Sequence, residues 1–275
     1  MNNPWKYKRK NKLEIDKVFN ELRSYINRLY QEYGKNSTQE GISKIENLST
    51  DDDFLDLCNR AARSIVIYQA NSNAKTWREA ARKSLQGKRV YEYLRKELNQ
   101  REKFNELIDQ SANFIKTLPI DISRRVVKKI GQLSLRGERS DTIASIITKY
   151  FPRASKASAT LIARTQVAKT YAAITQIRAQ SVGVQAYIWH TVGGPLVRDS
   201  HRHMDNVIVF YSEAPSPELL INKKSQGYYH AGNIYNCRCY QEPIIDINDL
   251  TWPKKVYYNG KIRTMSRKQF TKILK

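Results

Sequence analysis

The sequence predicts an α+β protein, with a mainly helical N-terminal region followed by a long helix packed on a small β-sheet and a basic C-terminal tail. Apolar residues recur at spacings of three and four through the first half of the chain, which is typical of amphipathic helices. After Gly183 the pattern changes to the short apolar runs of strands. The 275 residues suffice for one large or two modest domains. We divide them into a helical region (1–125), a second region (126–245) and a basic tail (246–275).

The first helix is predicted over residues 12–33, where apolar side chains form one stripe, and Gly34 ends it. The polar residues 35–41 are predicted to form a loop. A second helix is expected to begin after Ser49 and Thr50, which can cap it, and to run toward Tyr68.

Residues 75–116 have a helical pattern that fits two helices broken near Gly87. After Pro119 the pattern predicts two short helices joined at Arg136–Gly137, and then a long helix over residues 154–181. Strands are predicted at 184–192 and 207–212, and residues 228–245 end in another extended segment.

Composition limits the class of protein. No apolar run is long enough for a transmembrane helix, and the basic N-terminus lacks the apolar region of a signal peptide, so we expect use in a reducing cytoplasm. Three cysteines cannot build a disulfide framework, and Cys58 fits a small core residue.

The charge predicts a polyanionic partner. The 48 basic and 26 acidic residues give a net charge of +22, which favours nucleic acid first and an acidic protein surface second. Residues 142–198 contain seven basic residues and no acid, and residues 251–275 contain eight and none. Because no sequence-reading motif is present, we expect contact with double-stranded DNA without sequence specificity. A solvated surface is the alternative. The candidate contacts are Lys254, Lys255, Lys261, Arg263, Arg267 and Lys268.

A group of histidines and cysteines has the residue types of a zinc site: His201, His230, Cys237 and Cys239. The spacing differs from that of known zinc motifs, because C-x-C replaces C-x2-C. On a strand, Cys237 and Cys239 would share one face and could meet His201 across the sheet. We therefore expect no cofactor and a role in holding the sheet to its loops, with zinc as the alternative.

The grouping of His201 with Asp199 and Asp205 has the residue types of an acid/base or metal-nuclease site. No motif with a known mechanism is complete around them, so the chain is not expected to be an enzyme. Hydrogen bonds that fix a turn explain the same residues. The alternative is a metal-dependent nucleic-acid-processing enzyme that uses the histidine and cysteine cluster.

Read in order, several of these features resemble the Mu F-like phage head morphogenesis proteins, also called minor capsid proteins. That pattern has A-R-T early in a helix, a tryptophan strand, R-D followed by S-H-x-x-(Leu/Met)-D-G, and C-R-C. Here it maps onto Ala163–Arg164–Thr165, Trp189, Arg198–Asp199, Ser200–His201, Met204–Asp205 and Cys237–Arg238–Cys239. The match covers about residues 130–242. Gln166 replaces the family's usual glutamate, and Asn206 replaces a glycine but tolerates the same left-handed turn.

The resemblance implies a non-enzymatic minor head protein. Such a protein joins the procapsid in few copies during assembly in the host cytoplasm and lies inside the phage head. The implied partners are the portal protein, capsid or scaffold proteins, and packaged or entering DNA. Residues 1–125 would dock on the portal or capsid, and release with the genome is left open.

Overall fold

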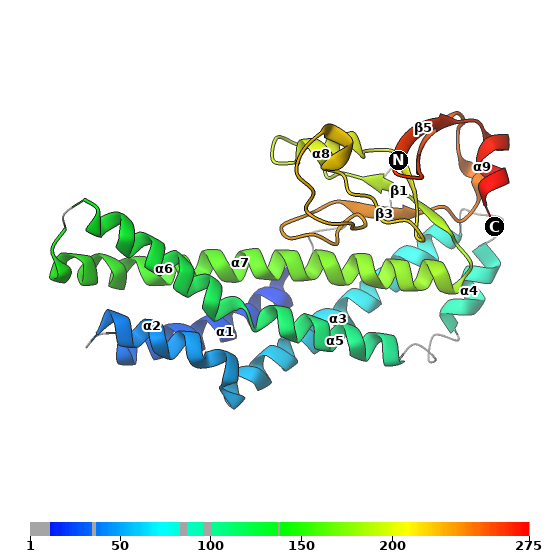
Figure 1. Cartoon of the computed structure of the whole chain (residues 1–275). Coiled ribbons are helices and arrows are strands. Elements are labelled where there is room, and N and C mark those ends of the chain that lie inside the picture. The colour runs from blue at the N-terminus through cyan, green and yellow to red at the C-terminus, as the bar shows by residue number, and fades with distance from the viewer. Residues whose placement is uncertain (1–11, 35–36, 83–86, 96–100, 137, 275) are drawn as a thin grey trace. The chain divides into compact units, whose positions relative to one another are not determined.

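The computed structural model describes residues 12–34, 37–82, 87–95, 101–136 and 138–274, and it has the α+β fold that the sequence predicts (Figure 1). The chain divides into two compact units. We call one the helical unit, formed by Arg9–Val66 and Lys103–Gln166, and the other the sheet unit, which includes Ile67–Glu102 and Val167–Lys275. Both units draw on residues before and after position 125, because two long helices contribute to each.

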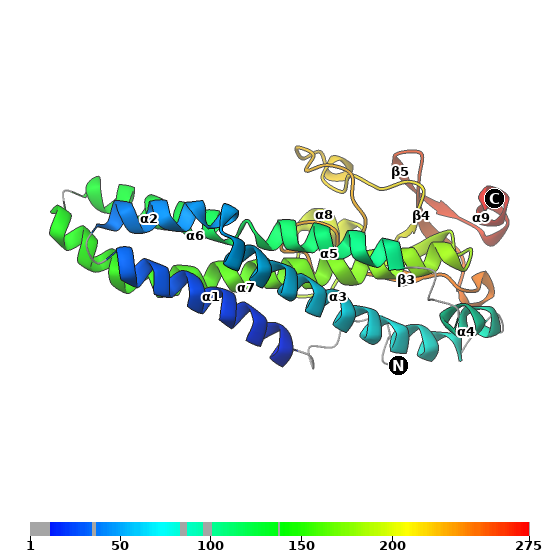
Figure 2. The ribbon, with the colours of Figure 1, turned by 90° about the horizontal axis from the view of Figure 1, so that it is seen from below.

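The helical unit contains α1 (Lys12–Tyr33), α2 (Thr38–Glu46), the short 3-10 helix η2 (Asn47–Thr50), α5 (Arg101–Ile115) and α6 (Leu118–Ser134), together with the first parts of α3 (Asp52–Ala81) and α7 (Ser140–Ser181). Helix α1 has the predicted bounds. Its apolar stripe is buried, with Leu22 and Ile26 fully covered. Figure 2 shows α1 beside α2, and Tyr30 of α1 stacks on Phe151 of α7 at 3.8 Å between ring centroids.

The prediction of a loop over residues 35–41 was wrong from Thr38 onward, where α2 begins. Ser37 caps this helix, because its hydroxyl accepts the Glu40 N–H at 3.3 Å. Gly41 does not break the helix but lets it approach α1. A Cβ there would come within 2.7 Å of the Gly34 Cα.

Two helices are longer than predicted. Helix α3 is capped by Asp51, whose carboxylate accepts the Phe54 N–H, rather than by Ser49 or Thr50, and it continues past Tyr68 to Ala81. Instead of two helices over 75–116, the structure has the end of α3, then α4 (Gly87–Arg95) and α5. Helix α7 is continuous through Pro152, so the expected separate helix over 154–181 is its second half. Buried side chains before and after the proline, Phe151 and Ala154, offset the lost hydrogen bond.

Five strands in the described part of the chain form one mixed sheet in the order β3-β1-β2-β4-β5. The predicted strands are present as β1 (Ala186–His190), β2 (Ile208–Phe210) and β3 (Tyr240–Pro243). The expected basic tail also folds, into the hairpin β4 (Lys254–Tyr258) and β5 (Lys261–Met265) and the helix α9 (Arg267–Ile273). Strand β4 pairs with β2 in parallel, and the other pairs are antiparallel. The connecting segments contain α8 (Asp199–His203), η4 (Leu219–Ile221) and η5 (Ile247–Asp249).

Both faces of the sheet are covered within the sheet unit. On one face Tyr187 and Trp189 pack in a cluster with Trp77 of α3 and Ala179 of α7, which gives the predicted packing of the long helix on the sheet (Figure 1). On the other face Ile208 and its neighbours pack around Phe270 of α9. In the described residues, no helix combines the length and apolar character needed to cross a bilayer.

Candidate metal centre

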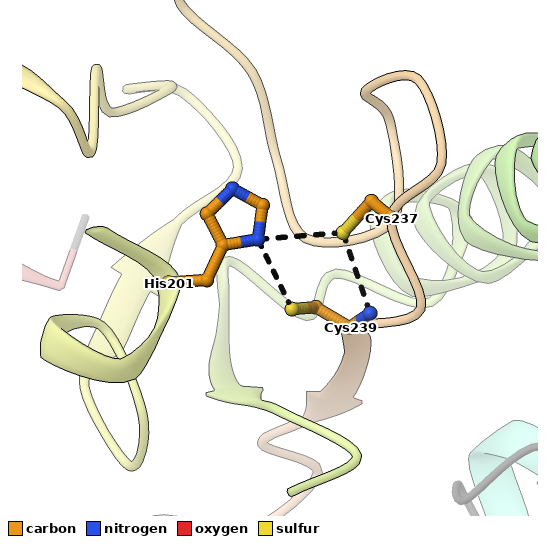
Figure 3. Close-up of side chains that lie close together, drawn as sticks. All are labelled: His201, Cys237 and Cys239. Atoms are coloured by element: carbon orange, nitrogen blue, oxygen red, sulfur yellow. Dashed lines mark hydrogen bonds between the residues drawn. The ribbon is translucent and has the colours of Figure 1, made fainter. Parts of the chain in front are cut away.

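Three of the predicted ligand residues converge in the sheet unit. The Nδ1 atom of His201 lies 3.5 Å from Sγ of Cys237 and 3.4 Å from Sγ of Cys239 (Figure 3). His201 comes from α8, and the cysteines come from the segment just before β3. Their exposed fractions are 2%, 3% and 7%, so the three ligand atoms are shielded from solvent.

Local contacts hold the two cysteines against α8. The Arg198 guanidinium, at the start of α8, donates to the Tyr235 carbonyl at 2.9 Å. The Cys239 backbone N–H donates to Sγ of Cys237 at 3.3 Å, which turns both sulfurs toward one point. Upstream, Gly232 has a φ of 88° and lies so close to α7 that a Cβ would come within 2.9 Å of the Ala172 Cβ. The small residues that the sequence places on α7 therefore allow this loop to approach.

A chain of hydrogen bonds orients the His201 ring. The Tyr229 hydroxyl donates to the Glu218 carboxylate at 2.6 Å, and Ser200 donates to the same oxygen at 3.1 Å. Burial alone would raise the pKa of Glu218, but these hydrogen bonds outweigh it and lower the pKa, so the carboxylate is ionised and can only accept. The Tyr229 oxygen, 3.1 Å from Nε2 of His201, must then accept the Nε2–H. In the neutral imidazole, Nδ1 thus presents its lone pair to the two sulfurs.

The two thiols are electrostatically unequal. The pKa of Cys237 is held well below that of a free thiol, because its sulfur lies in hydrogen-bond contact with the Cys239 side chain, with His201 and with the Cys239 backbone. The pKa of Cys239 is raised by its hydrogen bond to Cys237 and by burial. The Cys237 thiol therefore loses its proton more readily than the Cys239 thiol. Sulfur and imidazole nitrogen are both common metal-binding atoms.

The structure does not bring the fourth predicted ligand, His230, to this group. The Ala231 N–H donates to the Tyr187 hydroxyl at 3.2 Å, and that hydroxyl lies 3.2 Å from Nδ1 of His230. His230 also hydrogen-bonds the Tyr211 backbone, and burial lowers its pKa to about 4. The His230 ring thus helps to hold the loop to the sheet. His230 fits the structural role, as a neutral residue.

The grouping of His201 with Asp199 and Asp205 is also absent. Asp199 is exposed and pairs with Arg202 at 3.3 Å and with Lys223 at 3.2 Å, and the hydrogen bond from Lys223 is the main cause of its lowered pKa. The Asp205 carboxylate accepts the Thr191 N–H at 2.7 Å. It braces the turn at Asn206, which has the left-handed φ of 62° that the sequence predicts.

The remaining motif residues have structural positions. Trp189 is fully buried in β1, with its ring centroid 5.5 Å from that of His201. In the helical unit, Thr165 is buried and donates to the Leu161 carbonyl, whereas Arg164 is exposed. Arg238, between the two cysteines, is half-buried.

The predicted DNA contacts are mostly at the surface. Lys254 is half-buried, and the other five are exposed: Lys255, Lys261, Arg263, Arg267 and Lys268. One residue counted in the basic run of α7 does not fit that interpretation. Arg178 is 2% exposed and donates to the Ala70 carbonyl at 3.0 Å and to Asn73 at 2.8 Å, so it belongs to the core.

The chain is similar to a known protein family and to a curated protein. Residues 125–242 match the family described as phage Mu protein F like protein. A protein of Haemophilus influenzae, described as uncharacterized, is 30% identical over 177 residues, which cover 64% of this chain. The chain spans about a third of the relative's length, since the match covers 36% of it. No solved structure matches significantly.

Proposed function

Because residues 125–242 belong to the phage Mu protein F like family, we propose that the chain is a minor structural protein of a phage head that acts in head morphogenesis. The family match carries the proposal. The matched segment contains the whole His201, Cys237 and Cys239 group and the strands β1, β2 and most of β3. We infer from the same family that the protein is assembled in the host cytoplasm, joins the head in few copies and lies in its interior.

The β4–β5 hairpin and α9 supply the surface for DNA. Register pairs Val256 with Arg263 and Tyr258 with Lys261, so Lys254, Lys261 and Arg263 lie on one face of the hairpin. The exposed side of α9 adds a surface hollow lined by Arg267, Lys268, Thr271 and Lys272. Cations on a rigid hairpin and helix can contact successive phosphates without reading base sequence. This arrangement supports non-specific contact with double-stranded DNA.

An apolar stripe on the helical unit supplies the surface for the portal protein. On α6 and its C-terminal cap, Ile120, Val127 and Leu135 have exposed fractions of 37%, 52% and 91%. Their spacings of seven and eight place them on one side of the helix. Apolar side chains that gather on one exposed face commonly mark a protein-binding surface. We assign this stripe to docking on the portal or on neighbouring capsid or scaffold proteins.

The alternative of a metal-dependent nucleic-acid enzyme has less support. The three candidate ligands are almost completely buried, which keeps a polymeric substrate away from them. Asp199, which this alternative would use beside His201, pairs with the surface cations Arg202 and Lys223. The geometry thus favours a structural use of the cluster.

Quantitative mass spectrometry of purified heads tests the proposed function. We expect the protein in DNA-filled heads and in procapsids of the same infection, at low copy number relative to the major capsid protein. Depletion from emptied heads would show release with the genome. Absence from both particles would overturn the proposal.

A further inference from the structure

We propose that His201, Cys237 and Cys239 bind one Zn²⁺ ion, which fastens α8 to the segment that leads into β3. This inference rests on side-chain geometry in the sheet unit and is independent of the proposed role in the head. The sulfur and imidazole ligands favour zinc over the hard cations, which prefer oxygen.

The distances fit a shared ion. With Zn–S bonds of about 2.3 Å and Zn–N bonds of about 2.0 Å at a tetrahedral angle, a sulfur and a nitrogen ligand lie about 3.5 Å apart. The two observed separations from Nδ1 are 3.5 and 3.4 Å. All three donor atoms lie within 4.8 Å of one another.

Hydrogen bonding alone does not satisfy this arrangement. The Nδ1 lone pair of His201 can accept one S–H, yet both Cys237 and Cys239 direct their sulfurs at it. A divalent cation satisfies the lone pair and both sulfurs at once, and a Zn²⁺ with two thiolates leaves no net charge in the buried site.

The surroundings of His201 are those of a metal-ligating histidine. Such histidines donate the second ring N–H to a neighbouring oxygen, which orients the ring and fixes the tautomer. Here the Tyr229 hydroxyl oxygen accepts the hydrogen bond from Nε2–H, and the hydroxyl donates its own hydrogen bond to buried Glu218. Trp189 covers the ring edge-on and limits its rotation.

The ion would be structural. Residues of α8 and of the loop before β3 are far apart in sequence, and the ion would join them over the face of β1. Three protein ligands leave one tetrahedral position, which a water molecule can fill. Because the ligands are 2–7% exposed, that position is not open to a large substrate.

Metal analysis of the full chain, purified under reducing conditions with zinc supplied, tests the site. We expect one Zn²⁺ per chain in the wild-type protein and in the controls Cys58→Ala and His230→Gln, which change the remaining described cysteine and a histidine outside the group. We expect near-complete loss in Cys237→Ser, Cys239→Ser and His201→Gln. Undiminished zinc in any of these three variants would overturn the assignment. Another metal in place of zinc would overturn it as well.

A second measurement avoids variants that fail to fold. A chelator is added to the wild-type protein, and alkylation of each cysteine is followed by mass spectrometry. We expect Cys237 and Cys239 to react faster by on the order of tenfold after zinc removal, because free thiolates are the reactive species. Cys58, buried elsewhere in α3, reports global unfolding and should not change. Equal rates with and without chelator would mean that no ion protects the pair.

Discussion

The Tyr229 hydroxyl lies 3.1 Å from Nε2 of His201, the ring nitrogen that faces away from the two cysteines. This contact links the candidate zinc ligand to the Glu218 carboxylate, which accepts a hydrogen bond from the Tyr229 hydroxyl at 2.6 Å. The other oxygen of Glu218, Oε2, has no hydrogen-bond partner in the described structure. Tyr229 therefore hydrogen-bonds both His201 and Glu218.

Replacing Tyr229 by phenylalanine should weaken zinc binding without removing a ligand. We expect a loss of about 10- to 100-fold in affinity, the usual effect of losing the hydrogen bond that orients a ligating histidine. Chelator competition measures this change. Tyr228→Phe is the matched control, because that neighbouring side chain is 71% exposed. Equal affinities for both variants would show that Tyr229 does not orient the ligand.

Replacing Arg178 by methionine should destabilise the sheet unit. The variant leaves the Ala70 carbonyl and the Asn73 amide oxygen without their buried donor. We expect a loss of about 2–4 kcal/mol in the free energy of unfolding, measured with denaturant. Arg153→Met, an exposed position on the same helix, should change stability little. A similarly small change in both variants would contradict the core role of Arg178.

The buried, neutral His230 should make stability fall in mild acid. Burial lowers its pKa from 6.5 to about 4, so between these values the unfolded chain takes up a proton that the folded chain does not. The contribution is fully present above pH 6.5 and is lost as pH falls toward 4. From pH 7 to pH 5 we expect the wild type to lose about 2 kcal/mol more than His230→Gln. If the free energy of unfolding changed with pH equally in the two proteins, this expectation would be refuted.

Neutralising the basic hairpin and helix should reduce the salt dependence of DNA binding. The logarithm of the DNA-binding constant falls linearly with the logarithm of the salt concentration. Changing Lys261, Arg263, Arg267 and Lys268 to glutamine should make this negative slope shallower by up to about 4. Filter binding to double-stranded DNA over a range of salt measures the slope. Four exposed cations on the helices, Arg63, Lys75, Arg78 and Lys103, form the control set. An equal reduction by both sets would indicate general charge attraction instead of a defined surface.

The apolar stripe on α6 should be needed for incorporation into heads. Val127→Asp places a charge in the proposed portal contact, and we expect this variant to be lost from purified heads and from portal pull-downs. Ile67→Asp is a close control, since Ile67 is 53% exposed and Val127 is 52% exposed. Normal incorporation of the Val127 variant would remove the stripe from the docking surface.

The sequence contains a signal for the C-terminal hairpin, although residues 246–275 were expected to form a basic tail. Asn259 and Gly260 form an Asn-Gly turn with φ values of 49° and 73°, the most direct short-range signal of a hairpin. The high local charge favoured a tail instead. The alternation of apolar and polar residues along the strands was also incomplete, because Val256 and Tyr257 are buried on opposite faces of the sheet.

The convergence of the candidate site was only partly predictable. Strand alternation in C-R-C predicted that Cys237 and Cys239 could meet His201; the three lie together in the structure, although the cysteines precede β3 and are not part of a strand. Sequence spacing could not separate His230 from the group, because the Tyr187 hydroxyl that engages it comes from another strand. Glu218 and Tyr229 carried no signal at all. They lie in an irregular segment, where periodicity gives no direction for a side chain.

The parallel pairing of β2 with β4 has a consequence for the order of folding. Strands β1 and β2 pair across a short connection, whereas Ile208 meets Val256 only after the long segment containing β3 has been closed into a loop. Such non-local contacts form late, because loop closure costs entropy before any pairing compensates for it. Until then β2 is an unprotected apolar edge, open to pairing with another chain. Because β4 follows β1, β2 and β3 along the chain, this edge stays open during synthesis until β4 has emerged, and the nascent sheet is then sensitive to aggregation.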